Sequence, residues 1–410
     1  MAHETKTAAV FAGAFAKNPD FDFEVRCAIG AAANGAADIG EVLAAVREVG
    51  PKDHAGWFQA WRQLGERTAA AADAAASVGH DVTASSAYLR AAHYLGRAVN
   101  AVSGLADDSA LVPTFRAQQA AWDRFVDLAA DAQRLAIAYE GSTLPAVLFR
   151  SGDGRRPVLV LNLGSDESFA DAWAAAGPDA LARGYHVLLF EGPGQQSMLF
   201  EHDTSFRSDW EAVLTPVVDA LIARDDVDAD RLAVWGFSQA GYWVSRALAH
   251  EHRFAAAILD PGVVDVSTSW LEHLPKSMVD LVEHDEGAKF DRDLEWGMKL
   301  SPDLQHTWRF RARPYGGGDA ASVVAEVLKY RLGDDDAAAI TTPLLITEPE
   351  HEQFWPGQSA KLAAMTPSMS TLVPFTAAEG ADVHCEPLGH ALVAARVFDW
   401  LDERVNANAT

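Results

Sequence analysis

Apolar side chains in the first part of the chain recur at the three- and four-residue spacing of α-helices. Trp57, Trp61 and Leu64 share one such face, and no strand-like pattern occurs up to about residue 132. Gly79 follows a periodic stretch, where a glycine typically ends a helix in a left-handed conformation. We therefore predict a helical domain over residues 1–132 that contains an antiparallel hairpin, with the aromatic residues packed inside it.

The pattern changes near residue 134. Two short apolar segments, 135–139 and 146–149, flank a turn-forming stretch and predict a β-hairpin. Continuous apolar runs follow, as expected for strands that are covered on both faces. These runs are 158–163, 187–190, 232–235, 255–259 and 344–347. Helical stretches of ordinary crossover length separate most of them, so we predict an α/β fold with a mostly parallel sheet.

One interval, residues 261–342, is too long for a simple crossover between strands. It carries tryptophans among charged residues, which favours a helical lid inserted over the ends of the strands. The resulting prediction has three parts. Residues 1–132 form the helical domain, 133–260 and 343–410 form the α/β core, and 261–342 form the lid.

Composition narrows the classes of function. The 410 residues include 58 acidic and 33 basic side chains, giving a formal charge of -25 that disfavours nucleic acids and anionic membranes as partners. Two cysteines, Cys27 and Cys385, are too few for a disulfide framework or an iron–sulfur cluster, and they favour a reducing cytoplasm. No apolar run is long enough to span a membrane, and we expect no export signal.

The most informative motif is residues 236–241, Gly-Phe-Ser-Gln-Ala-Gly, which lie between an apolar run and a helix. This context predicts a nucleophile elbow, with Ser238 on a strained turn and Ala240 in place of the usual second glycine. The backbone amide of Gln239, at the start of the helix, is then a candidate oxyanion donor. The alternative interpretation is a glycine-rich tight turn with a capping serine.

A serine hydroxyl needs a base, and the fold places that base after the last strand, here predicted at 369–375. His384 lies in a loop at this point, whereas His390 opens the final amphipathic helix and is explained by the solvated helix start. We therefore expect His384 to be the base. The active site would thus combine Ser238 with His384.

The acid that orients the base is expected in the loop after the strand at 344–347. Three glutamates compete there, and a helix start at Pro356 makes Glu352 the best placed. Glu350 and Glu348 are the fallbacks in the same loop. Asp260, directly after the preceding strand, is the other alternative acid.

A second oxyanion donor is expected from the small-residue loop after the strand at 158–163, through the amide of Ser165 or of Gly164. A glycine-rich turn at 192–197 superficially resembles a dinucleotide-binding turn, but it has a proline between its glycines and Ser197 in place of the third. No zinc pattern is complete either. We therefore predict neither a cofactor nor a metal ion.

Taken together, three segments resemble the α/β-hydrolases: the elbow at 236–241, Glu-Gly-Pro-Gly-Gln at 191–195 and the stretch 379–387. More narrowly, the chain resembles the group of 2,6-dihydroxypseudooxynicotine hydrolase and the fungal pigment-pathway hydrolases that shorten polyketide chains. The similarity extends to 57–61 and 86–92 in the helical part. It implies a cofactor-free serine hydrolase, commonly a homodimer, whose N-terminal helices help to close the site.

Carried over residue by residue, this resemblance makes Ser238 the nucleophile and His384 the base. It leaves the bond open, because members of the group cleave esters or carbon–carbon bonds beside ketones. The sequence slightly favours hydrolysis of an ester, thioester or amide of a small molecule. Carbon–carbon cleavage would call for a further ionisable residue such as Asp260, Asp265 or His273. A non-catalytic ligand-binding protein on the same fold is the second alternative.

Overall fold

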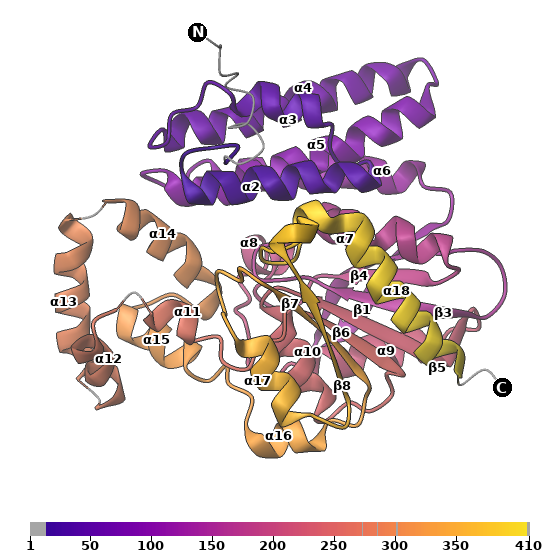
Figure 1. Cartoon of the computed structure of the whole chain (residues 1–410). Helices are drawn as coiled ribbons and strands as arrows, with labels where there is room; N and C mark the ends of the chain where they lie inside the picture. Colours follow the sequence, from indigo (N-terminus) through magenta and orange to yellow (C-terminus); the bar gives the residue numbers. More distant parts are fainter. Residues whose placement is uncertain (1–13, 273, 285, 301, 408–410) are drawn as a thin grey trace, which may run out of the picture.

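The computed structural model describes residues 14–272, 274–284, 286–300 and 302–407. Its centre is an eight-stranded sheet with strand order β1-β2-β4-β3-β5-β6-β7-β8 (Figure 1). The strands are β1 (Ala132–Tyr139), β2 (Ser142–Phe149), β3 (Arg156–Asn162), β4 (His186–Phe190), β5 (Val227–Phe237), β6 (Ala256–Asp260), β7 (Leu344–Pro349) and β8 (Ser370–Phe375).

The direction of the strands agrees with the apolar pattern. β1 and β2 form an antiparallel hairpin, β2 pairs antiparallel with β4, and the remaining pairs are all parallel. The predicted hairpin and the mostly parallel sheet are therefore confirmed. Because these strands run parallel, the loops that follow β3, β5, β7 and β8 all lie at the end of the sheet where the strands have their carboxyl ends.

Both faces of the sheet are covered, which explains why its strands are uniformly apolar. Leu159 and Leu161 belong to a hydrophobic cluster with residues of α7 (Phe169–Ala182) and α18 (His390–Ala407). Val158 and Val160 point to the other face and pack with residues of helices on that side. Those helices are α9 (Glu211–Ile222), α10 (Ala240–Leu248) and α17 (Gln358–Met365).

Helices precede the sheet along the chain and lie across the face that carries α7 (Figure 1). They are α2 (Pro19–Gly30), α3 (Ile39–Val46), α4 (His54–Ser77), α5 (Asp81–Ala101) and α6 (Leu111–Leu128). Gly79 has φ 76° between α4 and α5, as predicted for a left-handed helix end. Trp122 and Phe125 of α6 pack in the same cluster as Phe149 of β2, so these helices share a core with the sheet.

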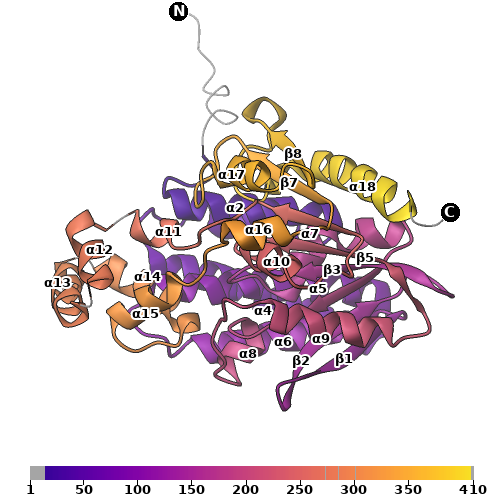
Figure 2. The ribbon, with the colours of Figure 1, turned by 90° about the horizontal axis from the view of Figure 1, so that it is seen from below.

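Between β6 and β7 the chain forms a helical segment, here called the insert (residues 261–343). Its helices are α11 (Thr268–Leu271), α12 (Lys276–Glu283), α13 (Gly287–Leu300), α14 (Pro302–Ala312), α15 (Ala320–Val327) and α16 (Asp334–Ala339). Figures 1 and 2 show most of it beside the sheet. Arg309 of α14 donates to the carbonyl oxygens of Leu105 and Ala106 at 3.0 Å each, which ties the insert to the N-terminal helices.

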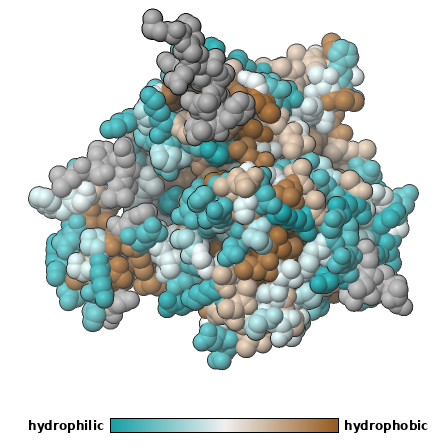
Figure 3. Space-filling model, viewed as in Figure 1, coloured by the Kyte–Doolittle hydropathy of each residue, from teal (hydrophilic) through white to brown (hydrophobic). Residues whose placement is uncertain are grey.

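The surface agrees with the acidic composition. The face in Figure 3 is largely hydrophilic, with smaller separate hydrophobic areas. Among the described helices, none combines the length and the apolar character that crossing a membrane would require.

Candidate active site

Ser238 occupies the tight turn between β5 and α10, with a left-handed φ of 55°. The flanking glycines are required by close backbone contacts. A Cβ on Gly236 would lie 2.6 Å from the carbonyl oxygen of Ala240, and one on Gly241 would lie 2.0 Å from that of Pro261. At position 240 the turn has room for a side chain, and the methyl group of Ala240 is fully buried there. The geometry is that of a strained strand–turn–helix elbow.

Ser238, His384 and Glu352 come together from three loops at the carboxyl ends of the strands. His384 Nε2 lies 2.9 Å from Ser238 Oγ. On the other side of the ring, His384 Nδ1 lies 2.8 Å from Glu352 Oε2 and 3.0 Å from Oε1. The amides of Phe354 and Trp355 donate to Glu352 Oε1 at 2.8 Å and 3.1 Å, so the carboxylate is held in place.

The alternative acids have other partners. Glu350 accepts from the amide of Ala377 at 2.8 Å, and the carboxylate of Asp260 accepts from Thr347 Oγ1 at 2.8 Å. Among the described residues, Glu352 is thus the carboxylate that is hydrogen-bonded to His384.

The remaining candidates from the sequence are placed elsewhere or not described. His390 Nε2 lies 2.9 Å from Asp179 of α7, and His390 also lines the cavity described below. The carboxylate of Asp265 accepts from Arg331 at 2.8 Å. His273 lies outside the described residues.

Glu352 and His384 each stabilise the charged form of the other. Burial disfavours the imidazolium, but the neighbouring Glu352 carboxylate outweighs this and raises the pKa of His384. Burial likewise opposes ionisation of Glu352, yet His384 and the two loop amides lower its pKa. A carboxylate at Nδ1 fixes the neutral ring with its proton on Nδ1, which leaves Nε2 free to accept from Ser238.

The candidate oxyanion donors differ in whether their backbone amides already have a hydrogen-bond acceptor. The amide of Gly164 donates to Glu167 Oε2 at 2.7 Å and is already paired. Within the described part of the chain, neither the Ser165 amide nor the Gln239 amide is paired with an acceptor. A Cβ on Gly164 would lie 2.9 Å from Ser238 Cβ, so this loop runs directly beside the serine.

The glycine-rich turn after β4 supports this loop. Gln195 Nε2 donates to the carbonyl oxygens of Leu163 and Gly164 at 2.7 Å and 2.9 Å. Gly194 has φ 80°, and a Cβ there would lie 2.1 Å from the Phe206 ring. The turn that superficially resembles a dinucleotide motif therefore serves to position the loop beside Ser238.

A cavity of about 370 Å³ opens at Ser238. It is bounded by the N-terminal helices, the loop after β3, the elbow and the insert. Its aromatic walls include Phe23, Trp57, Phe206, Trp270, Phe310 and Phe354. Across the part of the chain that is described, no group of three His, Cys, Asp or Glu side chains is arranged to hold a metal ion.

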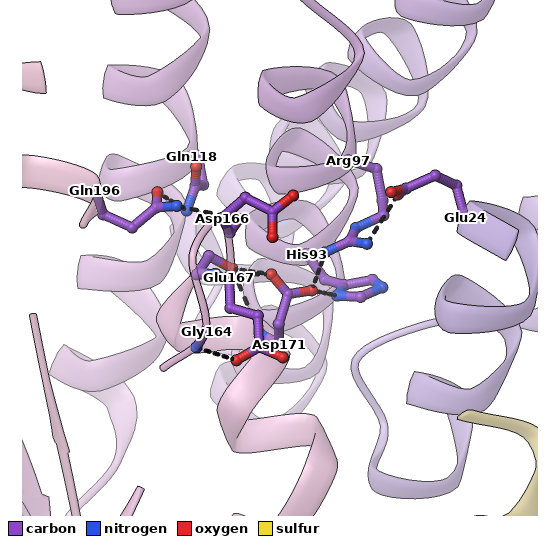
Figure 4. Close-up of polar contacts among 10 residues, drawn as sticks. Glu24, His93, Arg97, Gln118, Gly164, Asp166, Glu167, Asp171 and Gln196 are labelled. Atoms are coloured by element: carbon purple, nitrogen blue, oxygen red, sulfur yellow. Dashed lines mark hydrogen bonds and ion pairs between the residues drawn. The ribbon is translucent and has the colours of Figure 1, made fainter. Parts of the chain in front are cut away.

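A buried charged cluster lines the end of the cavity that faces the N-terminal helices (Figure 4). Arg97 of α5 donates to Glu24 of α2 at 2.8 Å and to Asp171 of α7 at 2.5 Å. His93 Nδ1 lies 3.0 Å from the same Asp171 oxygen. Burial lowers the pKa of His93, whereas Arg97 and His93 together outweigh the burial of Asp171 and hold its pKa well below the usual range.

Sequence reasoning did not find this cluster. Its members lie on separate helices, and a polar residue in a helical pattern is ordinarily expected to face solvent. The one local sign is the capping box at the start of α7, in which Asp171 pairs with Ser168. That pattern indicates a helix start and carries no information on Arg97.

Comparison with known proteins places this geometry in a family. Residues 179–295 match the model of the prolyl oligopeptidase family. Hydrolase LUC6 from a Fusarium species is 30% identical, with 93% of this chain and 96% of that protein covered. The 20-hydroxy-prefusarin hydrolase FUS2 from Gibberella moniliformis is 28% identical, with the same shares covered.

A solved structure shows the same fold. The crystal structure of 2,6-dihydroxy-pseudo-oxynicotine hydrolase matches with a TM-score of 0.71 at 20% identity, covering 92% of this chain and 96% of that one. The match includes the N-terminal helices as well as the sheet, because it spans nearly the whole chain. The protein described here therefore belongs to the α/β-hydrolase superfamily, in the group that contains these fungal hydrolases.

Proposed function

We propose that this hydrolase is a serine hydrolase that cleaves an ester, thioester or amide-type acyl bond of a small molecule. Ser238 is the nucleophile, His384 the base and Glu352 the residue that orients it. The observation that carries the proposal is the continuous path from Ser238 Oγ through both ring nitrogens of His384 to a buried carboxylate. This is the arrangement that activates a serine hydroxyl for attack on a carbonyl carbon.

In the first half-reaction, His384 Nε2 takes the proton of Ser238 as its Oγ bonds to the substrate carbonyl carbon. The negative charge that develops on the carbonyl oxygen is stabilised by the amides of Gln239 and Ser165. His384 then gives its proton to the leaving group, whose bond to the acyl carbon breaks. In the second half-reaction, water attacks the acyl-enzyme with His384 again as base. Loss of one oxyanion donor of this kind typically costs on the order of 100- to 1000-fold in turnover.

The cavity supports a substrate with an apolar body and a polar group. The same cavity is lined by aromatic side chains and by the charged cluster. The name of the Gibberella relative gives 20-hydroxy-prefusarin as its substrate. A medium-sized small molecule is consistent with both observations. The expected homodimer and cytoplasmic location stay predictions.

Carbon–carbon bond hydrolysis beside a ketone is the second candidate reaction. It needs the same nucleophile and base, together with a group that stabilises charge on the leaving group. The specific observation that favours it is that Glu167, a residue lining the cavity, is hydrogen-bonded to Gly164 in the loop beside the elbow.

Hydrolysis of a p-nitrophenyl ester, a thioester and an aryl β-diketone by the purified protein tests the proposal. We expect turnover of at least one class, and loss of that turnover in Ser238→Ala. Ser165→Ala is the matched control, because it removes a cavity hydroxyl but keeps the backbone amide. Unchanged turnover in Ser238→Ala contradicts the assignment, and no turnover of any class favours a non-catalytic ligand-binding protein.

A further inference from the structure

Glu167 lies in the loop between β3 and α7 and is one of the residues that line the cavity. One oxygen, Oε2, accepts from the Gly164 amide at 2.7 Å (Figure 4). Within the described residues, no donor or acceptor is paired with the other oxygen, Oε1. A Cβ on Gly164 would lie 2.9 Å from Ser238 Cβ and 3.4 Å from Glu167 Cδ, so the carboxyl and the serine flank the same glycine.

The groups around Glu167 favour its neutral form. Burial is the main cause of its raised pKa, and the Gly164 amide opposes it. The Asp171 and Asp166 carboxylates add to the rise and Arg97 counters it less strongly, so that the pKa of Glu167 rises to about 8.

Cys27 of α2 and Cys385 of the loop after His384 also face this carboxyl, and burial raises the pKa of both thiols well above the usual value. Neither thiol therefore carries charge at neutral pH. The raised pKa of Glu167 favours its protonated form at pH 7. Since Oε2 accepts from an amide, the O–H lies on Oε1, the oxygen that is left for the cavity.

We propose that Glu167 is a further catalytic residue, which donates a hydrogen bond from Oε1 to a ketone oxygen in the leaving group of the substrate. The inference rests on the proposed serine mechanism and concerns its second candidate reaction, for which it names the group that stabilises the leaving group. In that reaction the bond cleaved is a carbon–carbon bond between an acyl carbon and the carbon next to a ketone.

Cleavage of the carbon–carbon bond moves one electron pair and one proton to the leaving group. The Ser238 Oγ–C bond forms and the C–C bond breaks, and its electron pair passes to the leaving group as an enolate. His384 gives the proton that it took from Ser238 to the enolate carbon. Glu167 keeps its proton throughout and holds the enolate oxygen, as a neutral carboxylic acid can. An ester has no such ketone in its leaving group and needs only His384.

Two substrates and two variants separate this role from a structural one. The diketone is 2,2-dimethyl-1-phenylbutane-1,3-dione, whose quaternary central carbon cannot lose a proton, and the ester is p-nitrophenyl acetate. Glu167→Gln keeps an acceptor for the Gly164 amide and an N–H donor but does not titrate. Glu167→Leu has about the same size and keeps neither. The measured quantity is kcat/KM for each substrate from pH 6 to pH 10.

The neutral acid is present below its pKa and is lost as the pH rises through it. For the wild type, we therefore expect the ratio of diketone to ester kcat/KM to fall above about pH 8, and in Glu167→Gln to stay level. In Glu167→Leu we expect a loss on the order of 100-fold for the diketone at pH 7, as for a lost oxyanion donor, and a change within a few-fold for the ester.

Three results would overturn the inference. One is an alkaline decline in Glu167→Gln that matches the wild type. Another is an equal loss for both substrates in Glu167→Leu, which would make Glu167 a brace for the loop. The third is ester turnover by the wild type without diketone turnover, which leaves the proposed serine mechanism standing. Failure of both substrates would contradict the proposed function itself.

Discussion

The Glu352→Gln substitution is predicted to cost about four orders of magnitude in kcat. The carboxylate and the His384 ring are nearly buried, with side-chain exposures of 7% and 5%, so solvent cannot replace the lost charge. The amides of Phe354 and Trp355 hold Oε1, and glutamine would keep its oxygen there. Its NH₂ group would then face His384 Nδ1, which forces the ring proton onto Nε2, the atom that must accept from Ser238.

A triad substitution with this effect on the tautomer typically lowers kcat about 10⁴-fold, which corresponds to about 5 kcal/mol of transition-state stabilisation. Steady-state hydrolysis of whichever substrate the wild type turns over, followed across pH, measures it. Glu350→Gln is the matched control, since that carboxylate contacts the Ala377 amide and not His384. A loss of less than tenfold in Glu352→Gln, or equal losses in the two variants, would refute the assignment of Glu352.

The remaining predictions concern pH and stability. Wild-type activity should fall at acid pH with a midpoint above 6.5, because His384 must be neutral to accept a proton and its pKa is raised; a midpoint below 6 in kcat/KM profiles contradicts this. Arg97→Met should lower the free energy of unfolding by about 3–5 kcal/mol in urea titrations, since it removes the cation that pairs with the carboxylates of Glu24 and Asp171. A loss under 1 kcal/mol would mean that the cluster is not stabilising. Gly241→Ala should lower the free energy of unfolding by about 1–3 kcal/mol or more, because the new Cβ would lie 2.0 Å from the Pro261 carbonyl oxygen. Gly297→Ala is the control, since its Cβ would have open space and the substitution should be neutral or stabilising. Equal melting temperatures of the two variants would refute the contact.

The sequence predicted best what depends on local chain geometry. Ser238 was identifiable because a strained turn requires small residues at Gly236 and Gly241, and those requirements are visible in a stretch of a few residues. The preference for Glu352 rested partly on a helix starting at Pro356. In the structure that helix, α17, begins at Gln358, so the reason was approximate although Glu352 is the carboxylate next to His384.

The parts that depend on contacts between distant elements could not be predicted. Arg97 and Asp171 come together only because α5 packs against α7, and helical periodicity does not show which polar residue is turned inward. Glu167 presents the same difficulty. It lies two residues after Ser165, a candidate donor, yet the direction of its side chain follows from the loop's backbone and from the Gly164 amide that it accepts.

The central claim is that Ser238 carries an activated hydroxyl. Treatment of the folded protein with a fluorophosphonate probe, followed by mass spectrometry of its peptides, tests this most directly. We predict one covalent adduct, located on Ser238 within the peptide that spans residues 236–241, and its absence from Ser238→Ala and from protein unfolded beforehand. An adduct on another serine, or undiminished labelling of Ser238→Ala, would contradict the account.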